Sequence, residues 1–504
     1  MSRYAWMMST GRGIATGCCA LALLAGSAGA ISSAWNVDAN GSWTNGANWN
    51  NGAPTNAGDS AYFTNAITQG RTVTIDGPVK VGAVYIGQSG VTSNFTINLG
   101  SNGTLTFDSG SGADAVLQLN YLGARPLVGA NIVLNSDLDI ISRTSASIYF
   151  EINSVFTGNH NIYMNPGVAT GGTPYMGGNN VAWVGNFTLC NGQLLYKGGN
   201  DSFFGCASNG MRLITFSNNA SLRNNGTLAT LGTNKQIVVG TGGGGFILHG
   251  KNTTLPYAGQ LVGTNIFFLS TDAGNNAANI FTLGSNNDAY ATSLSVYDNT
   301  TLKFGASGSL TSAPLICLFA TGACLDVSSK TAGYSIPPGQ VLAGGGIVTG
   351  VVNVANAAAK IHPGTNVLAG SVSAPGVLTI NGGLSFANGG VYAWDLNQLK
   401  DSAYAPGTTT YAQINVTNGT VNLSGGTLAI NFIGVVSTNT PSSTNIFWKS
   451  GHTWTILTAA AAPVGTLSVS NGVYPNWMFK TQVSGNTLQL VYSQRTPTTA
   501  LLFR

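Results

Sequence analysis

One segment in the first third of the sequence holds the residues best suited to acid–base chemistry. Asp137 and Asp139 are two positions apart, so on a β-strand both carboxylates lie on one face, about 6.5–7 Å apart. Arg143 and Glu151, the single glutamate in 504 residues, follow closely. Paired carboxylates with a neighbouring base would suit a β-helical polysaccharide lyase or a glycoside hydrolase. Two aspartates on a solvent-facing strand also occur without any chemical role, so both interpretations stay open.

The same segment could hold a structural calcium ion. Calcium takes six to eight oxygen ligands, and Asn135 would add one to those of the two aspartates. A second acidic stretch, Asp38-Ala-Asn40-Gly-Ser42, offers three side-chain ligands, although an Asx turn is the simpler explanation there. We therefore expect no cofactor, with structural calcium as the alternative.

Tryptophans gather near the start of the sequence. Trp35, Trp43 and Trp49 lie within 15 residues and are followed by Pro54 and Asp59. Tryptophan faces stack well on sugar rings, so these side chains are candidates for binding a glycan. A stack of β-coils also needs a cap that seals the apolar end of its first coil. The sequence predicts such a Trp-rich cap over residues 31–75, with glycan binding as the alternative.

Four cysteines lie after residue 30 and are candidates for disulfide bonds. They are Cys190, Cys206, Cys317 and Cys324, and they allow three connectivities. Proximity in sequence favours Cys190–Cys206 and Cys317–Cys324, each closing a short excursion of the chain. Buried thiols are the alternative.

The composition is typical of neither an ordinary soluble enzyme nor a disordered chain. Charged residues make up 7% of the sequence, against about 25% in an average chain, while 69 residues are glycine. Hydrophobic residues make up 43%, enough to bury a large core. The net charge is +4, and no run of Lys or Arg is present, so we expect no nucleic-acid partner.

Period-two alternation predicts short strands throughout the sequence. Apolar and small polar residues alternate in pairs of strands around Asn, Gly or Ser turns, as in Phe95–Phe107, Phe187–Tyr196 and Gly419–Ile430. One such unit cannot bury its apolar face alone, whereas stacked units can. The pattern predicts an all-β, elongated right-handed parallel β-helix over residues 76–435, and residues 436–504 are expected to add C-terminal β-strands and a tail. A series of β-sandwiches is the competing architecture.

The N-terminus has the pattern of a secretory signal peptide over residues 1–30. Arg3 and Arg12 precede an apolar stretch at 13–25, and Ala28-Gly29-Ala30 forms an A-x-A cleavage site. We therefore expect export to the cell surface or beyond. No mature segment has the length of about 18 apolar residues that spans a membrane, so no membrane-spanning segment is expected there.

With these repeats in view, the sequence resembles the autotransporter-associated β-strand repeat proteins, which are secreted bacterial proteins. The resemblance rests on Val341–Gly350, on His362-Pro-Gly364 leading to Pro375–Ile380, and on the stretch from Leu384 to Leu428. It implies a right-handed β-helix at the bacterial surface with adhesive or structural roles and no shared catalytic residues. The C-terminal membrane barrel of autotransporters and the short sorting tail of other relatives are not recognisable in the sequence.

The sequence therefore predicts a secreted, non-catalytic structural or adhesive rod. Its expected partners are a surface glycan or further copies of itself. An enzyme of the lyase or hydrolase class on the same scaffold, or a glycan-binding module, is the alternative.

Overall fold

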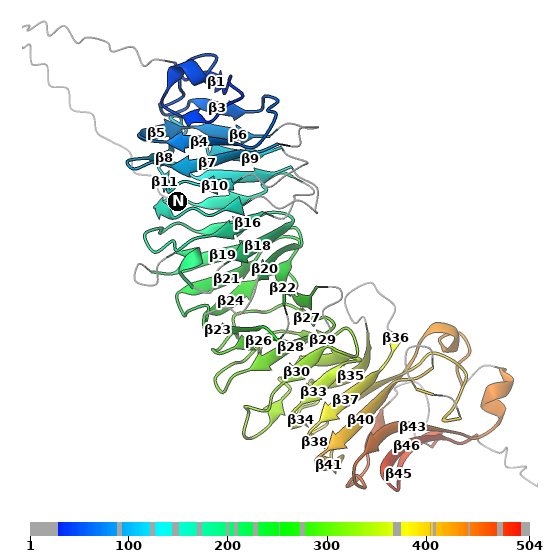
Figure 1. Ribbon diagram of the computed structural model, residues 1–504. Helices are drawn as coiled ribbons and strands as arrows, with labels where there is room; N and C mark the ends of the chain where they lie inside the picture. Colours follow the sequence, from blue (N-terminus) through cyan, green and yellow to red (C-terminus); the bar gives the residue numbers. More distant parts are fainter. Residues whose placement is uncertain are drawn as a thin grey trace, which may run out of the picture.

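The chain forms a stack of β-coils in which strands lie one above another along the long axis (Figure 1). The computed structural model describes residues 29–87, 93–120, 127–143, 151–168, 174–197, 201–205, 210–224, 230–250, 252–272, 278–365, 374–403, 405–406, 410–441, 444–470 and 477–494. Within them all regular structure is β-strand or short 3-10 turn, with no α-helix. The predicted all-β class and stacked parallel architecture are confirmed.

Each complete coil contributes strands in a fixed order to three faces. The first face runs from one end of the stack to the other, and its strands pair in parallel from β2 to β44 except where β36 lies antiparallel to β35. Its strands are β2 (Gly41–Ser42), β4 (Arg71–Ile75), β7 (Phe95–Leu99), β10 (Leu127–Gly129), β13 (Glu151–Ile152), β16 (Tyr175–Gly177), β18 (Gln193–Lys197), β20 (Ala220–Asn224), β22 (Gly244–Leu248), β25 (Phe267–Thr271), β27 (Leu294–Val296), β29 (Leu315–Leu318), β32 (Val341–Gly344), β35 (Lys360–Thr365), β36 (Ala374–Pro375), β39 (Val391–Leu396), β42 (Thr427–Phe432) and β44 (Ser468–Ser470).

The second face is built from two sheets that take the same place in the coil order. A four-stranded sheet serves the first coils, and a ten-stranded sheet serves the later ones and ends in antiparallel strands. Its strands are β5 (Pro78–Val81), β8 (Thr104–Phe107), β11 (Ile132–Leu134), β14 (Phe156–Gly158), β23 (Thr254–Tyr257), β26 (Asn279–Leu283), β28 (Thr300–Phe304), β30 (Cys324–Asp326), β33 (Ile347–Thr349), β37 (Val377–Asn381), β40 (Gln413–Asn418), β43 (His452–Ala459), β45 (Phe479–Ser484) and β46 (Thr487–Tyr492).

The third face likewise has two sheets, of ten and four strands. In the described part of the chain, short 3-10 turns interrupt the coils: η1 (Gly46–Asn48), η2 (Asp201–Phe204), η4 (Gly434–Val436) and η5 (Ile446–Lys449). The strands of the third face are β1 (Ser32–Ala34), β3 (Ser60–Phe63), β6 (Ala83–Ile86), β9 (Ala115–Leu119), β12 (Leu138–Ser142), β15 (Ile162–Met164), β17 (Phe187–Leu189), β19 (Arg212–Phe216), β21 (Lys235–Val239), β24 (Gln260–Gly263), β31 (Tyr334–Ser335), β34 (Val352–Val354), β38 (Leu384–Phe386) and β41 (Val421–Asn422).

The alternating sequence pattern produces this arrangement because every second side chain points into the stack. In β12, for example, Leu138, Ile140 and Ser142 are buried and the residues between them face outward. The inward side chains of successive coils merge into one core cluster that extends from Trp35 to Tyr492. The corners between strands use the expected turn residues, such as Asn218 and Asn219, which adopt positive φ.

The described strands of the two terminal regions, 31–75 and 436–494, add to the stack rather than forming separate lobes. β4 pairs with β7 across the boundary expected at residue 76, and β42 pairs with β44 across the one expected at residue 436. The parallel stacking therefore continues through both boundaries. At the C-terminal end β43, β46 and β45 form antiparallel pairs, which close the second face with a different pattern of strands.

Candidate functional site

Three carboxylates meet where the chain turns from the second face to the third. Asp137 lies just before β12, and Asp139 lies on its outward side. Ala115 pairs with Leu138, and the Ala115 amide donates to the Asp137 carbonyl over 2.7 Å, which places Asp114 of the preceding coil at the same corner. We call Asp114, Asp137 and Asp139 the acidic edge.

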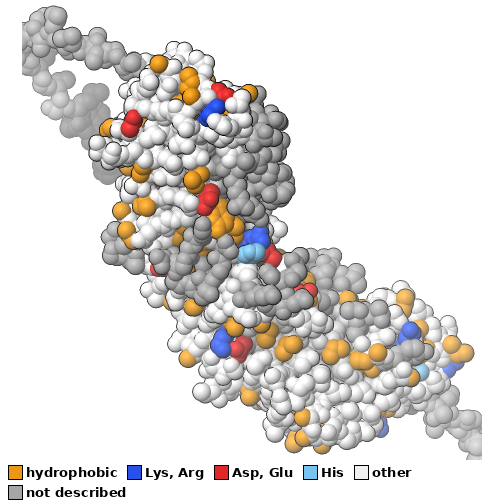
Figure 2. Space-filling model, viewed as in Figure 1, with side chains coloured by type: hydrophobic (Ala, Val, Ile, Leu, Met, Phe, Trp, Pro, Cys, Tyr) orange, Lys and Arg blue, Asp and Glu red, His pale blue; other side chains and the backbone are white. Residues whose placement is uncertain are grey.

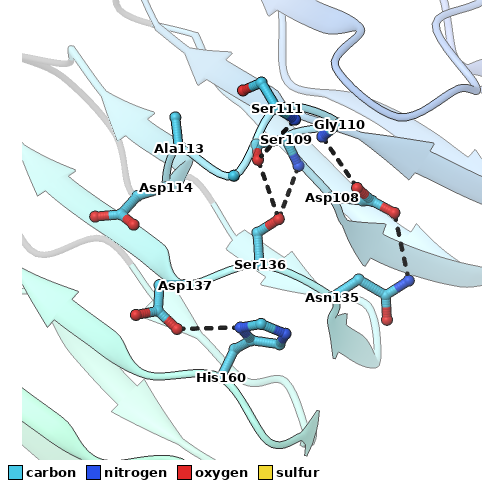
Figure 3. Close-up of a pocket in the computed structure, with 11 residues that line it drawn as sticks. Asp108, Ser109, Gly110, Ser111, Ala113, Asp114, Asn135, Ser136, Asp137 and His160 are labelled. Carbon is cyan, nitrogen blue, oxygen red and sulfur yellow. Dashed lines mark hydrogen bonds and ion pairs between the residues drawn. The ribbon is translucent and has the colours of Figure 1, made fainter. Parts of the chain in front are cut away.

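An open pocket of about 470 Å³ adjoins the acidic edge (Figure 3). Hydrogen bonds between two coils shape it: the Ser109 amide donates to Ser136 Oγ over 3.0 Å, and Asn135 Nδ2 lies 3.5 Å from Asp108 Oδ2. Eight of its eleven lining residues have polar side chains, which can form hydrogen bonds with a ligand rich in hydroxyl groups. The lining residues are Asp108, Ser109, Gly110, Ser111, Gly112, Ala113, Asp114, Asn135, Ser136, Asp137 and His160.

Asp137 is held as a carboxylate by the next coil. Its oxygens accept hydrogen bonds from the Asn161 main chain at 2.8 Å and the Asn161 side chain at 3.0 Å, and Oδ1 lies 3.1 Å from His160 Nδ1. Partial burial would raise the pKa of Asp137, but these hydrogen bonds outweigh burial and hold the pKa below its usual value. Asp137 is therefore ionised over the whole neutral range.

Asp139 has the opposite tendency. Partial burial raises its pKa to about 6, and the negative charges of Asp114 and Asp137 add to the effect. Asp139 pairs in register with Tyr163, whose hydroxyl lies 3.5 Å from Asp137 Oδ2. Two neighbouring carboxyl groups with separated pKa values can act as a general acid and a general base near neutral pH.

Strand alternation predicts that Asp137 and Asp139 share a face, but it does not predict that Asp114 and His160 lie beside them. Asp114, Asp137 and His160 follow one another at intervals of 23 residues. Ala115 pairs with Leu138, also 23 positions on, so this interval is the local length of one coil. A search for polar residues at the coil interval would have found the group.

Arg143 and Glu151 do not join the acidic edge. Arg143 is exposed and follows the far end of β12. Glu151 lies in β13 on the first face, where its Oε1 accepts a hydrogen bond from Asn153 over 2.8 Å. The four residues expected to act together are therefore split, and the expectation is wrong for Arg143 and Glu151.

The alternative of a structural calcium ion gains no support from the geometry. No group of three or more His, Cys, Asp or Glu side chains among the described residues could hold a metal ion. At the other acidic stretch Asp38 Oδ1 lies 2.7 Å from Arg71 Nε, and hydrogen bonds from Arg71 and Thr68 lower the pKa of Asp38 to about 2. Asn40 Oδ1 accepts from the Thr72 amide. The side-chain oxygens of Asp38 and Asn40 therefore accept hydrogen bonds from the next coil.

The tryptophans lie inside the stack and cannot stack on a sugar. The exposed fractions of Trp35, Trp43 and Trp49 are 1%, 0% and 4%. Their rings pack against one another and against Phe63 at centroid distances of 5.1–6.0 Å. The Trp43 and Trp49 indole N–H groups donate to the carbonyls of Pro54 and Trp43. Glycan binding by these three residues is wrong, because burial removes the faces that a sugar would contact.

The expected disulfide bonds are not formed by the cysteines that the structure describes. Cys317 is buried on the first face beside Leu315 and Ala343. Cys324 lies around a corner in β30, with Sγ 3.8 Å from Thr349 Oγ1. The Cys317–Cys324 pairing is therefore wrong, since the two thiols occupy different faces. Cys190 is also a thiol, and Cys206 lies outside the described residues.

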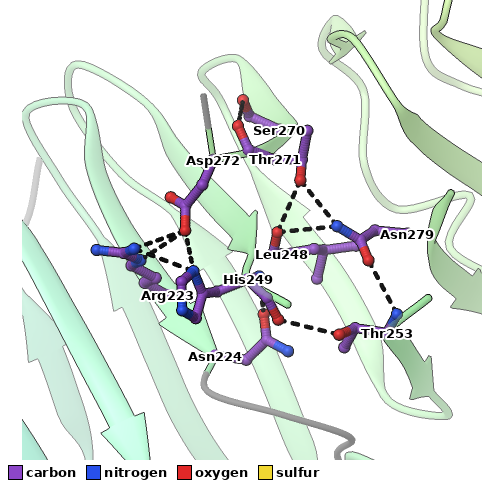
Figure 4. A network of polar contacts seen from close by, with 9 residues as sticks. All are labelled: Arg223, Asn224, Leu248, His249, Thr253, Ser270, Thr271, Asp272 and Asn279. Carbon is purple, nitrogen blue, oxygen red and sulfur yellow. Dashed lines mark hydrogen bonds and ion pairs between the residues drawn. The ribbon is translucent and has the colours of Figure 1, made fainter. Parts of the chain in front are cut away.

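A second polar cluster ties three coils together on the first face (Figure 4). Arg223 in β20 places Nη2 2.6 Å and Nε 3.0 Å from Asp272 Oδ2, just beyond β25. His249, just beyond β22, contacts the same oxygen through Nδ1 and lies 3.0 Å from Arg223 Nη2. The stacking of successive coils brings these charged side chains together.

Comparison with known proteins identifies no relative of this chain. No protein-family model, no curated protein and no solved structure matches it. The function must therefore be inferred from the fold and the acidic edge.

Proposed function

We propose that this protein is a secreted, non-catalytic structural or adhesive rod of a bacterial surface or extracellular matrix. One observation carries the proposal: a single core joins stacked coils from Trp35 to Tyr492, beneath a surface with few charges (Figure 2). Such a body resists bending and presents long rows of small polar side chains. Its partner would be a surface glycan or another copy of the chain, with no nucleic acid involved.

The finer features of the fold belong to the same proposal. The β-helix would be right-handed, with the Trp cluster as its N-terminal cap and the antiparallel β43–β46–β45 unit as its C-terminal cap. Membership of the autotransporter-associated β-strand repeat proteins would follow from the glycine-rich coils at 341–428. Export would depend on residues 1–30; the signal peptide expected there falls almost wholly outside the described residues, which begin at 29.

No helix among the described residues has the length and apolar character needed to cross a membrane.

Imaging of the purified chain from residue 31 onward tests the rod directly. Negative-stain micrographs should show separate elongated particles or fibres built from them. Binding of the same preparation to a panel of bacterial polysaccharides, and its sedimentation over a range of concentrations, separates glycan attachment from self-association. Compact round particles that bind no glycan and do not associate would contradict the proposal.

A second candidate function is cleavage of a polysaccharide at the acidic edge. It is favoured by the pair Asp137 and Asp139, whose pKa values shift in opposite directions beside an open polar pocket. Here Asp139 would donate a proton to the leaving oxygen, and Asp137 would act on the sugar or on a water molecule. This activity is the alternative to a passive rod.

Reducing-sugar release and formation of unsaturated products over a polysaccharide panel test this candidate. Asp137→Asn and Asp139→Asn should each abolish any activity found, whereas the matched control Glu151→Gln should leave it unchanged, because Glu151 lies on another face. Absence of product from the wild-type chain at every pH between about 4 and 8, the range in which such an acid–base pair would work, would remove the candidate.

A further inference from the structure

Lys235 is a charged side chain placed inside the core. It begins β21 on the third face and points inward, and its side chain has an exposed fraction of 0%. An ammonium group without access to water loses its hydration, and that loss is offset only by a close counter-ion with good hydrogen bonds. The contacts of its amino group therefore determine which chemical form of the Lys235 side chain is stable in the core.

Among the described residues, three oxygen atoms lie near the amino group, all at long distances. Nζ is 3.1 Å from the Gly205 carbonyl, 3.3 Å from Asn234 Oδ1 and 3.4 Å from Asp201 Oδ2. Charge-assisted hydrogen bonds of this kind are normally about 2.7–2.9 Å. The partly exposed pair Lys303 and Asp326 in the same protein has that geometry, at 2.8 Å. Lys235 and Asp201 are adjacent, but they do not form a short ion pair.

Asp201 is held against the lysine and has an unsatisfied oxygen. It begins the turn η2, and its Oδ1 is buried and accepts no hydrogen bond from the described residues. A Cβ atom at Gly232 would lie 2.9 Å from Asp201 Oδ2, so the backbone packs closely behind the carboxylate. A buried oxygen without a donor is costlier as part of a charged carboxylate than as the carbonyl oxygen of a neutral amide, because the desolvation penalty is larger for charged groups.

We propose that Lys235 and Asp201 are joined by an isopeptide bond. Proton transfer along the Nζ–Oδ2 contact converts the ammonium and carboxylate into an amine and a carboxylic acid. The amine lone pair then forms the N–C bond with Asp201 Cγ, the C–O bond of the acid hydroxyl breaks, and the hydroxyl leaves with an amine proton as water. The product is a neutral amide whose N–H donates to the Gly205 carbonyl. No oxidant, reductant or other reactant is needed.

The bond would connect two coils of the stack by a covalent bridge. Asp201 begins η2, between β18 and β19, and Lys235 begins β21, which pairs with β19 in parallel. The bridge closes a loop of the unfolded chain in the way that a disulfide does, and it needs no oxidising surroundings.

Mass measurement of the full chain after reduction and denaturation tests the proposal. The wild-type mass should be one water molecule below the value calculated from the sequence, and Lys235→Met should restore the calculated mass. In a tryptic digest, segment 198–212 should be linked to segment 224–251 with no cleavage at Lys235. Lys303, the matched control beside Asp326, should be cleaved normally.

The mass and the tryptic digest of the wild-type chain test the proposal even if Lys235→Met fails to fold. A mass equal to the calculated one, or cleavage at Lys235, would overturn the proposal. Loss of ammonia instead of water would also overturn it, because the lysine would then have reacted with an amide such as that of Asn234.

Discussion

Asp137 and Asp139 lie two residues apart, yet the fold gives them opposite pH behaviour. The pKa of Asp139 in the folded chain is about 6, against an ordinary value of about 3.9 in an unfolded chain. The folded state therefore binds a proton more tightly than the unfolded state. Asp139 favours folding at low pH, and its contribution is lost as the pH rises through about 6.

Asp139→Asn should therefore stabilise the chain at about pH 8 and change little at about pH 4. We expect a gain on the order of 1 kcal/mol at the higher pH, below the full linkage value because the side chain is only partly buried. Urea unfolding of both chains at the two pH values measures the gain. An equal effect at both pH values would show that Asp139 does not titrate as described.

Asp137→Asn supplies the control of opposite sign. Hydrogen bonds from Asn161 and His160 lower the pKa of Asp137, so its contribution to folding is present at neutral pH and is lost as the pH falls through the lowered pKa. The Asp137→Asn variant should be less stable than the wild type at neutral pH, and the two should converge in acid. The same urea series includes this comparison.

At the scale of residues, the alternation of apolar and polar residues predicts that Asp137 and Asp139 lie on one face of a strand. It does not predict which residues of the neighbouring coils lie beside them. The coil length varies along the chain: Ser32 pairs with Ser60, 28 positions on, whereas Ile361 pairs with Tyr392, 31 positions on. A single period taken for the whole chain therefore does not reveal the local interval of 23 residues that aligns Asp114 and His160 with Asp137. Whether the tryptophans can bind a glycan and whether the cysteines can pair depends on the face that each side chain occupies. That face is set by the register of the coils and does not follow from spacing in the sequence alone.

At the scale of strands, glycine sets how closely two coils approach on the first face. A Cβ atom added to Gly245 in β22 would lie 1.9 Å from the Phe268 carbonyl of β25. That atom belongs to the backbone of a paired strand and cannot move aside without breaking the ladder. Gly242 and Gly243 adopt positive φ and form the tight corner that precedes β22.

Gly245→Ala should destabilise the chain by about 3 kcal/mol or more, because the added methyl group overlaps with a paired strand. Gly46→Ala is the matched control: the nearest atom to its added Cβ is 3.9 Å away, and it should change stability by less than about 0.5 kcal/mol. Thermal or urea unfolding of both variants tests the difference. Equal stabilities would mean that β22 and β25 are not packed in this register.

At the scale of the whole molecule, the stack behaves as a row of units that contact mainly their neighbours. Each first-face strand pairs with the strands of the coils before and after it, as β22 does with β20 and β25. In such a row the stability of one coil depends on adjacent coils and only weakly on distant ones. Sequence repetition predicts this one-dimensional order, but it does not reveal where the sheets of the second and third faces end and new ones begin.

Trp43→Ala at one end of the row tests how far destabilisation spreads. Loss of this buried ring should cost about 3–5 kcal/mol locally. In hydrogen exchange, amides of β3, β4 and β6 should lose protection, while those of β37, β40 and β43 should match the wild type, because many coils separate them from Trp43. Gly245→Ala should instead affect β20 and β25 on both sides of β22. A uniform loss of protection along the chain in either variant would show that the stack unfolds as one cooperative body and would contradict nearest-neighbour coupling.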